Sequence, residues 1–215
     1  MPRAPDDGNP TRFGPRKYPL LAGSLDWDLD HAMSLPPTLY DVQIALSHVD
    51  RGFDTQQLSL KVARHPSESM ERLWLRILAF CWLWDSRLVF TNGLSEPDAP
   101  DLESRDYTNV VTRWVRVGKA DPTKIQRAVD QNSNAKVSVL FDSPARLEAF
   151  LSEARVAKTS RIAKAELAAV DIAFLTALSA FNVRRIRLEL TLVGDHFYAD
   201  CEGQSFDGAL TRASF

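Results

Sequence analysis

The stretch LKVARHPSESMERLWLRILAFCWLW, residues 60–84, decides the fold because a strand pattern changes into a helix pattern within it. Apolar and polar residues alternate over residues 58–62, which is typical of a half-buried strand. The polar break that follows predicts a helix from Glu68 to about Trp84. Residues 77–84 are apolar on all sides, so we expect this helix at the centre of the molecule.

A second alternating run, residues 40–46, precedes this stretch, and a short connection at 50–52 separates the two. Two such runs predict an N-terminal β-hairpin. Residues 1–33 differ, with five prolines, three glycines and no period of 2 or 3.6. They predict a flexible extension or a wrongly assigned start, although Trp27 could dock locally. Residues 34–215 then form a single domain.

Strand and helix patterns alternate downstream of the buried helix. We expect strands at 110–117, 136–141, 185–192 and 196–201, and helices at 122–131, 143–155 and 173–181. Residues 166–172 fit either a strand or a helix, and residues 91–108 are expected to form a loop. With the hairpin, this order predicts an α/β fold, an α+β mixed sheet flanked by helices.

The composition excludes several classes of protein. The chain has 215 residues, 45% of them hydrophobic, and a net charge of −2, which rules out collagen-like and disordered chains and a histone-like coat on nucleic acid. Its longest charge-free apolar stretches, 77–84 and 172–183, are well short of the roughly 20 residues of a membrane span. Two cysteines and no visible secretory signal predict a cytoplasmic protein with no membrane partner.

Acidic residues suggest one kind of site. Glu68 and Glu71 are three residues apart, so on one helix they share a face and could converge on a divalent cation or a catalytic water. The alternative is that they complement the macrodipole in the first turn of the helix. The acidic loop 96–106, which ends at Asp106, could also hold a metal, or it could be solvated surface. The scattered histidines and cysteines predict no structural zinc site.

Basic residues suggest a second kind of site, one that binds phosphate groups. Eleven Lys and Arg stand against five acids between Arg113 and Lys164. Such a surplus indicates a surface that faces phosphates, with solubilising helix faces as the alternative. The residues expected to contact nucleic acid are Arg116, Lys119, Lys124 and Arg127.

Residues 60–79, LKVARHPSESMERLWLRILA, resemble the signature of the YaeQ family, as do FTNGL at 90–94, WVRVG at 114–118 and DPTKIQRA at 121–128. The resemblance extends over about residues 38–213. The family's function is uncharacterised, and its fold is similar to that of the PD-(D/E)xK nuclease superfamily. In that superfamily a helix Glu and two strand carboxylates hold Mg²⁺, which prefers oxygen ligands, and a Lys assists.

The resemblance implies a catalytic set in this chain drawn from Glu68, Glu71, Asp106 and Lys124. The two strand positions that carry acids in the superfamily hold Thr112 and Arg116 here. The resemblance therefore implies a degraded site with no bound metal and no cofactor, in which Arg116 pairs with Glu68 or Glu71 instead of an ion.

Three hypotheses follow for the function. The favoured one is a nuclease-like fold that binds nucleic acid, or a protein partner, without cleavage. The second is a Mg²⁺-dependent nuclease whose lost carboxylates are replaced by Asp106 or the acidic loop. The third is a regulatory or protein-interaction module that uses Trp74, Trp82 and Trp84, although burial explains those tryptophans equally well.

Overall fold

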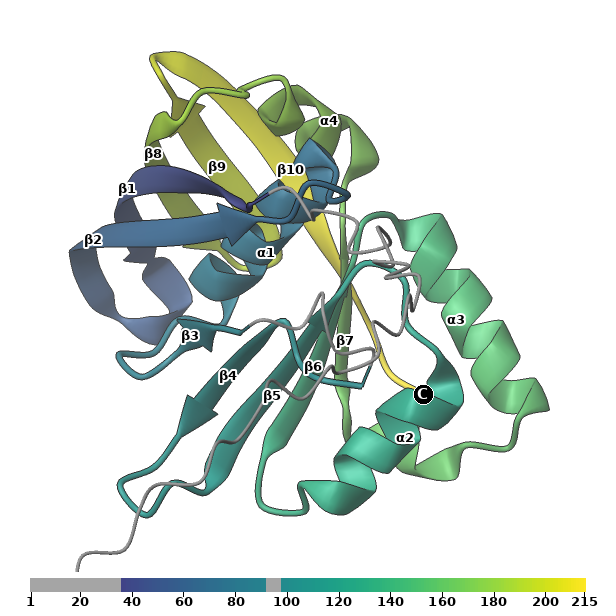
Figure 1. Ribbon diagram of the computed structural model, residues 1–215. Coiled ribbons are helices and arrows are strands. Elements are labelled where there is room, and N and C mark those ends of the chain that lie inside the picture. The colour runs from purple at the N-terminus through teal and green to yellow at the C-terminus, as the bar shows by residue number, and fades with distance from the viewer. Residues whose placement is uncertain (1–35, 92–97) are drawn as a thin grey trace, which may run out of the picture. The chain divides into compact units, whose positions relative to one another are not determined.

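A computed structural model describes residues 36–91 and 98–215 of the chain. The predictions for residues 1–33, Trp27 and Glu96 lie outside these ranges. Within them, all strands join one mixed sheet of ten strands, in the order β2-β1-β8-β9-β10-β7-β6-β5-β4-β3 (Figure 1).

The predicted N-terminal hairpin is confirmed. β1 (Thr38–His48) and β2 (Phe53–Arg64) pair antiparallel, and a short 3₁₀ turn, η1 (Val49–Arg51), connects them. The other edge of β1 pairs in parallel with β8 (Arg185–Val193), so the hairpin lies beside the C-terminal part of the chain. β9 (His196–Cys201) then follows β8 in an antiparallel pair.

One long strand, β10 (Gln204–Ala213), joins the two halves of the sheet. Its residues 204–209 pair with β9, and its residues 210–213 pair with β7 (Glu166–Val170). In Figure 1 it is the yellow strand that runs from the upper to the lower half of the domain. The sequence prediction assigned no strand here.

The second half of the sheet continues from β7. β7, β6 (Lys136–Phe141) and β5 (Val111–Val117) are parallel neighbours, and β4 (Leu102–Arg105) and β3 (Val89–Phe90) complete the edge in antiparallel pairs. The strand option for residues 166–172 is confirmed. The expectation of a loop over residues 91–108 is wrong at β4. This segment has no apolar run that would mark a strand, and it forms one because it pairs with β5.

Helices cover both faces of the parallel strands. Alternate side chains of β5 to β7 pack against α1 (Met70–Trp82) and α4 (Ile172–Ser179) on one face, and against α2 (Pro122–Gln131) and α3 (Pro144–Val156) on the other. A 3₁₀ turn, η2 (Ser160–Lys164), follows α3. These helices confirm the mixed α/β prediction.

The central helix is buried as predicted, but it begins later. Ser69 caps α1 by accepting a hydrogen bond from the N–H of Arg72, so Glu68 lies before the helix. Trp74 and Trp82 are buried in the core, and Trp84 is half-buried. These tryptophans therefore leave little surface for the proposed protein-interaction module. In the described ranges, no helix has the length and apolar character needed to cross a membrane.

Candidate functional site

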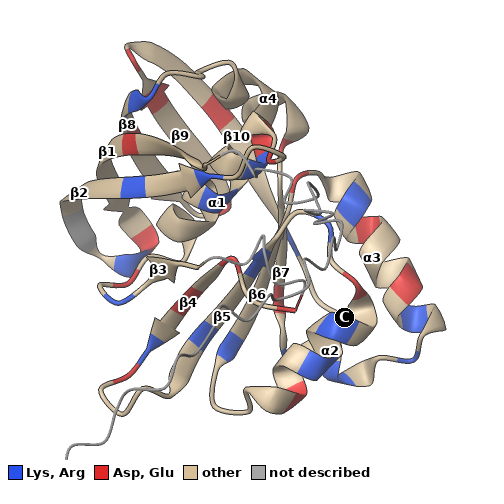
Figure 2. Cartoon of the chain, in the orientation of Figure 1, with Lys and Arg blue, Asp and Glu red and all other residues tan. Residues whose placement is uncertain are grey.

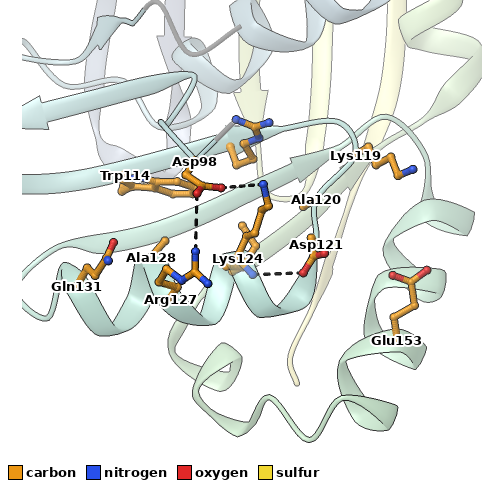
Figure 3. Close-up of a pocket in the computed structure, with 12 residues that line it drawn as sticks. Asp98, Trp114, Lys119, Ala120, Asp121, Lys124, Arg127, Ala128, Gln131 and Glu153 are labelled. Carbon is orange, nitrogen blue, oxygen red and sulfur yellow. Dashed lines mark hydrogen bonds and ion pairs between the residues drawn. The ribbon is translucent and has the colours of Figure 1, made fainter. Parts of the chain in front are cut away.

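A cavity of about 300 Å³ lies beside α2, on the α2–α3 face of the sheet (Figure 3). Its residues come from β5, the turn after β5, α2, α3 and the chain just before β4. They are Asp98, Trp114, Arg116, Lys119, Ala120, Asp121, Lys124, Ile125, Arg127, Ala128, Gln131 and Glu153.

The turn between β5 and α2 fixes the position of this site. Gly118 ends β5 with a φ of 73°, a left-handed conformation that favours glycine. Asp121 then caps α2, because its carboxylate accepts the N–H groups of Thr123 at 2.8 Å and Lys124 at 3.3 Å. These hydrogen bonds, with that from the Thr123 hydroxyl first, lower the pKa of Asp121.

The four basic residues predicted to contact nucleic acid all line this cavity. Lys124 and Arg127 are three residues apart on α2, so they share a face of the helix, and both extend toward Asp98 (Figure 3). Figure 2 shows Lys and Arg along both β5 and α2. Lys119 is exposed and forms no ion pair with any residue in the described ranges. The structure thus brings together cations that the sequence only placed near one another.

Of the three acids that line the cavity, Asp98 is the one that pairs with Lys124 and Arg127. Its carboxylate lies 2.7 Å from Lys124 Nζ and 3.7 Å from a terminal guanidinium nitrogen of Arg127. The hydrogen bond from Lys124, followed by the charges of Lys124 and Arg127, lowers the pKa of Asp98. The carboxylate therefore stays ionised between the two cations at neutral pH.

The cavity also has an apolar part, beside the polar side chains of Asp121, Gln131 and Glu153. Trp114 and Ile125 belong to the core between the sheet and α2, and each presents part of its surface to the cavity together with Ala128. A ligand here therefore meets both cations and an apolar wall formed by Trp114, Ile125 and Ala128. Such a combination suits an anionic ligand that carries a ring or other apolar part.

The carboxylates expected to hold a metal lie elsewhere and are already paired. Glu68 is only 3% exposed, and its two oxygens accept hydrogen bonds of 2.8 Å each from the guanidinium group of Arg76. The expectation that Glu68 and Glu71 share a helix face is wrong, because α1 begins after Glu68 and Glu71 is exposed. Glu68 serves as the buried counter-charge of Arg76.

Asp101 is the carboxylate that the site prediction missed. It is 1% exposed and lies directly before β4, where it accepts the N–H of Val117 at 2.9 Å and pairs with Arg72. Arg116 Nε lies 3.7 Å from Asp101 Oδ2, the oxygen that also accepts the Val117 N–H, so Arg116 pairs with Asp101 and not with Glu68 or Glu71 as expected. No local pattern in the sequence marks Asp101, because its partners Arg72 and Val117 are 29 and 16 residues away along the chain.

Thr112 and Asp106 lie away from this network. Thr112 is four residues from Arg116 on β5, roughly 13 Å along the strand, so the two positions cannot serve one ion. Asp106 lies in the β4–β5 turn and accepts hydrogen bonds from Thr108 and Val110. These hydrogen bonds lower the pKa of Asp106, with that from the Thr108 side chain first. Asp106 is thus placed to shape the turn.

Across residues 36–91 and 98–215, no three or more His, Cys, Asp or Glu side chains gather where they could hold a metal ion. Glu68 and Asp101 flank Arg72, whose Nε lies 3.9 Å from Glu68. Each of these two carboxylates has a guanidinium group as its partner, that of Arg76 for Glu68 and that of Arg72 for Asp101. The chemistry that this arrangement offers is therefore anion binding in the cavity next to Arg116.

Comparisons with known proteins identify the relatives. The family model described as YaeQ protein matches residues 33–209. The proteins named "Uncharacterized protein YaeQ" from Salmonella typhi and Escherichia coli are each 31% identical over 160 residues, which cover 74% of this chain and 86% of theirs.

Two solved structures share the fold. The YaeQ protein from Xanthomonas axonopodis pv. citri superposes with a TM-score of 0.74 at 27% identity, over 83% of this chain and 98% of that one. The YaeQ protein from Pseudomonas syringae gives a TM-score of 0.73 at 23% identity, over 83% and 97% of the two chains.

Proposed function

Because the chain belongs to the YaeQ family, whose relatives are named as uncharacterised, we propose a function from the site itself. The protein binds nucleic acid through the cavity beside α2 and does not cleave it. The supporting observation is the convergence of Arg116, Lys119, Lys124 and Arg127 on one cavity. Cationic side chains that contact phosphates supply most of the sequence-independent affinity for nucleic acid.

The cavity favours an unpaired strand over a duplex. It is concave and small, and its apolar wall includes Trp114. Bases of a single strand are free to contact an aromatic surface, whereas bases in a duplex are stacked on one another. We therefore expect single-stranded DNA or RNA to bind more tightly than duplexes of the same length.

The absence of cleavage follows from the pairing of the carboxylates. Mg²⁺ sites that act on phosphates use carboxylate oxygens as ligands. Glu68 is held by Arg76, and Asp101 is held by Arg72 and Arg116. An ion would have to replace these cations, and Arg116 occupies a position where the resembled nucleases carry an acid. As part of the same proposal, the fold is a PD-(D/E)xK nuclease-like fold with a degraded metal site.

Both cysteines support a reducing compartment, which we take to be the cytoplasm. Cys81 and Cys201 are free and buried. Burial raises the pKa of the Cys201 thiol to about 12, and it raises that of Cys81 further, so neither thiol is a nucleophile at neutral pH.

A binding and cleavage panel tests the proposal. Labelled single-stranded and duplex DNA and RNA are incubated with the protein, with and without Mg²⁺ or Mn²⁺, and both the bound fraction and the strand length are measured. We expect single strands to bind and to remain intact under all metal conditions. Metal-dependent shortening of any strand, abolished by Asp106→Ala in a protein that remains folded, would instead establish the nuclease with relocated carboxylates.

A further inference from the structure

The carboxylate of Asp98 is an anion that two cations of the cavity already bind. It lies between Lys124 and Arg127, which contact it from one face of α2 (Figure 3). The capping position of α2 is already filled by Asp121, so the helix terminus itself offers no further anion site. The place for an anion is thus defined by Asp98 and its two cations.

We propose that the cavity is a subsite for one phosphorylated nucleotide unit, whose phosphate displaces Asp98 from Lys124 and Arg127 and whose base packs on the wall formed by Trp114, Ile125 and Ala128. This inference rests on the proposed nucleic-acid binding and names the part of the ligand that is recognised. Asp98 then acts as an internal competitor that holds the two cations in place until a phosphate arrives.

The size of the cavity matches a single nucleotide unit. Its volume of about 300 Å³ is at the lower end of the range typical of small-molecule sites, roughly 300–1,000 Å³. Its lining also offers both kinds of contact that one nucleotide needs, because β5 and α2 each contribute cations and apolar side chains to it. A longer strand would enter the cavity with one unit and continue along the exposed surface of α2.

A phosphate can replace the carboxylate of Asp98 at low energetic cost. The side chains of Asp98 and Lys124 are 61% and 45% exposed, and exposed ion pairs of this kind contribute little to stability. A phosphate monoester carries more negative charge than a carboxylate and offers more acceptor oxygens to the planar fork of an Arg. Lys119, with no ion-pair partner among the described residues, is available as a third cation on the rim.

Calorimetric titration of the full chain tests the subsite. The probes are a nucleoside monophosphate, the matching nucleoside, inorganic phosphate, and one short single strand with either a 5′-phosphate or a 5′-hydroxyl. We expect the monophosphate to bind more tightly than the nucleoside or inorganic phosphate alone, because it contacts both the cations and the apolar side chains of the cavity. A preference for the 5′-phosphorylated strand over the monophosphate would identify a strand end as the source, and the reverse preference would identify a free nucleotide.

Asp98→Asn is the decisive variant, since it removes the competing charge and keeps the shape of the side chain. We expect it to tighten monophosphate binding about twofold to fivefold, the range expected from the loss of one exposed ion pair. Asp130→Asn is the matched control, because Asp130 on α2 forms an exposed ion pair with Arg161 of η2 but does not line the cavity. Lys124→Gln should weaken binding of the monophosphate.

The outcomes separate this inference from the proposed function. If single strands bind but the monophosphate does not, or if Asp98→Asn changes affinity no more than Asp130→Asn does, the subsite is refuted while nucleic-acid binding stands. If neither the strands nor the monophosphate bind, both proposals are refuted.

Discussion

Glu68 illustrates, at the scale of single residues, how the partners of a carboxylate decide its role. The sequence suggested a helix acid, but the side chain is buried and both oxygens contact Arg76. We predict that Glu68→Ala lowers the free energy of unfolding by about 3–5 kcal/mol, because the guanidinium group of Arg76 is left buried and unpaired. Urea unfolding measures this loss.

The matched control is Glu71→Ala, an exposed acid in the first turn of the same helix. We expect its free energy of unfolding to stay within about 0.5 kcal/mol of the native value. Equal effects of the two substitutions would contradict the buried pairing of Glu68.

Arg116 supplies a positive charge beside the buried carboxylate of Asp101. Replacement by Glu removes a cation and places a second carboxylate beside Asp101, whose oxygen now lies 3.7 Å from Arg116 Nε. We predict that Arg116→Glu gains Mg²⁺ binding that the unmodified protein lacks, measured by titration of the metal into the protein. Thr112→Asp is the control, because that position is roughly 13 Å along β5 and should gain nothing. The opposite ranking of the two variants would restore the original assignment of Thr112 to the metal site.

At the scale of elements, the sequence predicted best where the signal is local. The hairpin of β1 and β2 follows from two alternating runs, and α2 and α3 follow from Asp121 and Ser143, which cap them as expected. Asp101 and Glu68 could not be placed in this way. Their partners are 15 and 8 residues away along the chain, and periodicity carries no information about such pairs.

The strand β10 was missed for a physical reason. It changes neighbours after residue 209, and Gly208 interrupts its side-chain pattern. A Cβ atom at Gly208 would lie 2.4 Å from the Cβ of Phe174, so α4 packs directly on the strand backbone at this point. Tertiary packing, not strand propensity, therefore selects glycine here.

We predict that Gly208→Ala lowers the free energy of unfolding by about 1–3 kcal/mol, since α4 must move away from β10 to make room. Denaturant unfolding provides the measurement. Thr211→Ala, at an exposed position of the same strand, is the control and should have little effect. A Gly208→Ala protein as stable as this control would show that α4 does not pack tightly on the strand.

At the scale of the whole molecule, the domain boundary stays a prediction. The family model matches residues 33–209, and the preceding stretch lacks the periodicity of a packed segment. We expect a chain without residues 1–33 to unfold at nearly the same temperature as the full chain. A midpoint lowered by more than about 5 °C, which corresponds to roughly 1–2 kcal/mol in a domain of this size, would contradict this boundary.

The whole chain has nearly balanced charge, so binding of nucleic acid depends on where the cations lie. Lys124 and Arg127 in the cavity can be compared with Lys61 and Arg185, an equally charged and exposed pair on β2 and β8 in the other half of the sheet. Removing either pair changes the net charge by the same amount. Only the first pair belongs to the cavity.

The most direct test is the salt dependence of single-strand affinity for the unmodified protein and these two double variants. Each phosphate contact adds about 0.7 to the slope of log affinity against log salt concentration. We predict that Lys124→Ala with Arg127→Ala weakens binding and reduces the slope by roughly 1.4, and that Lys61→Ala with Arg185→Ala leaves both unchanged. Equal slopes for all three proteins, or no binding by the unmodified protein, would contradict the assignment of the cavity as the nucleic-acid site.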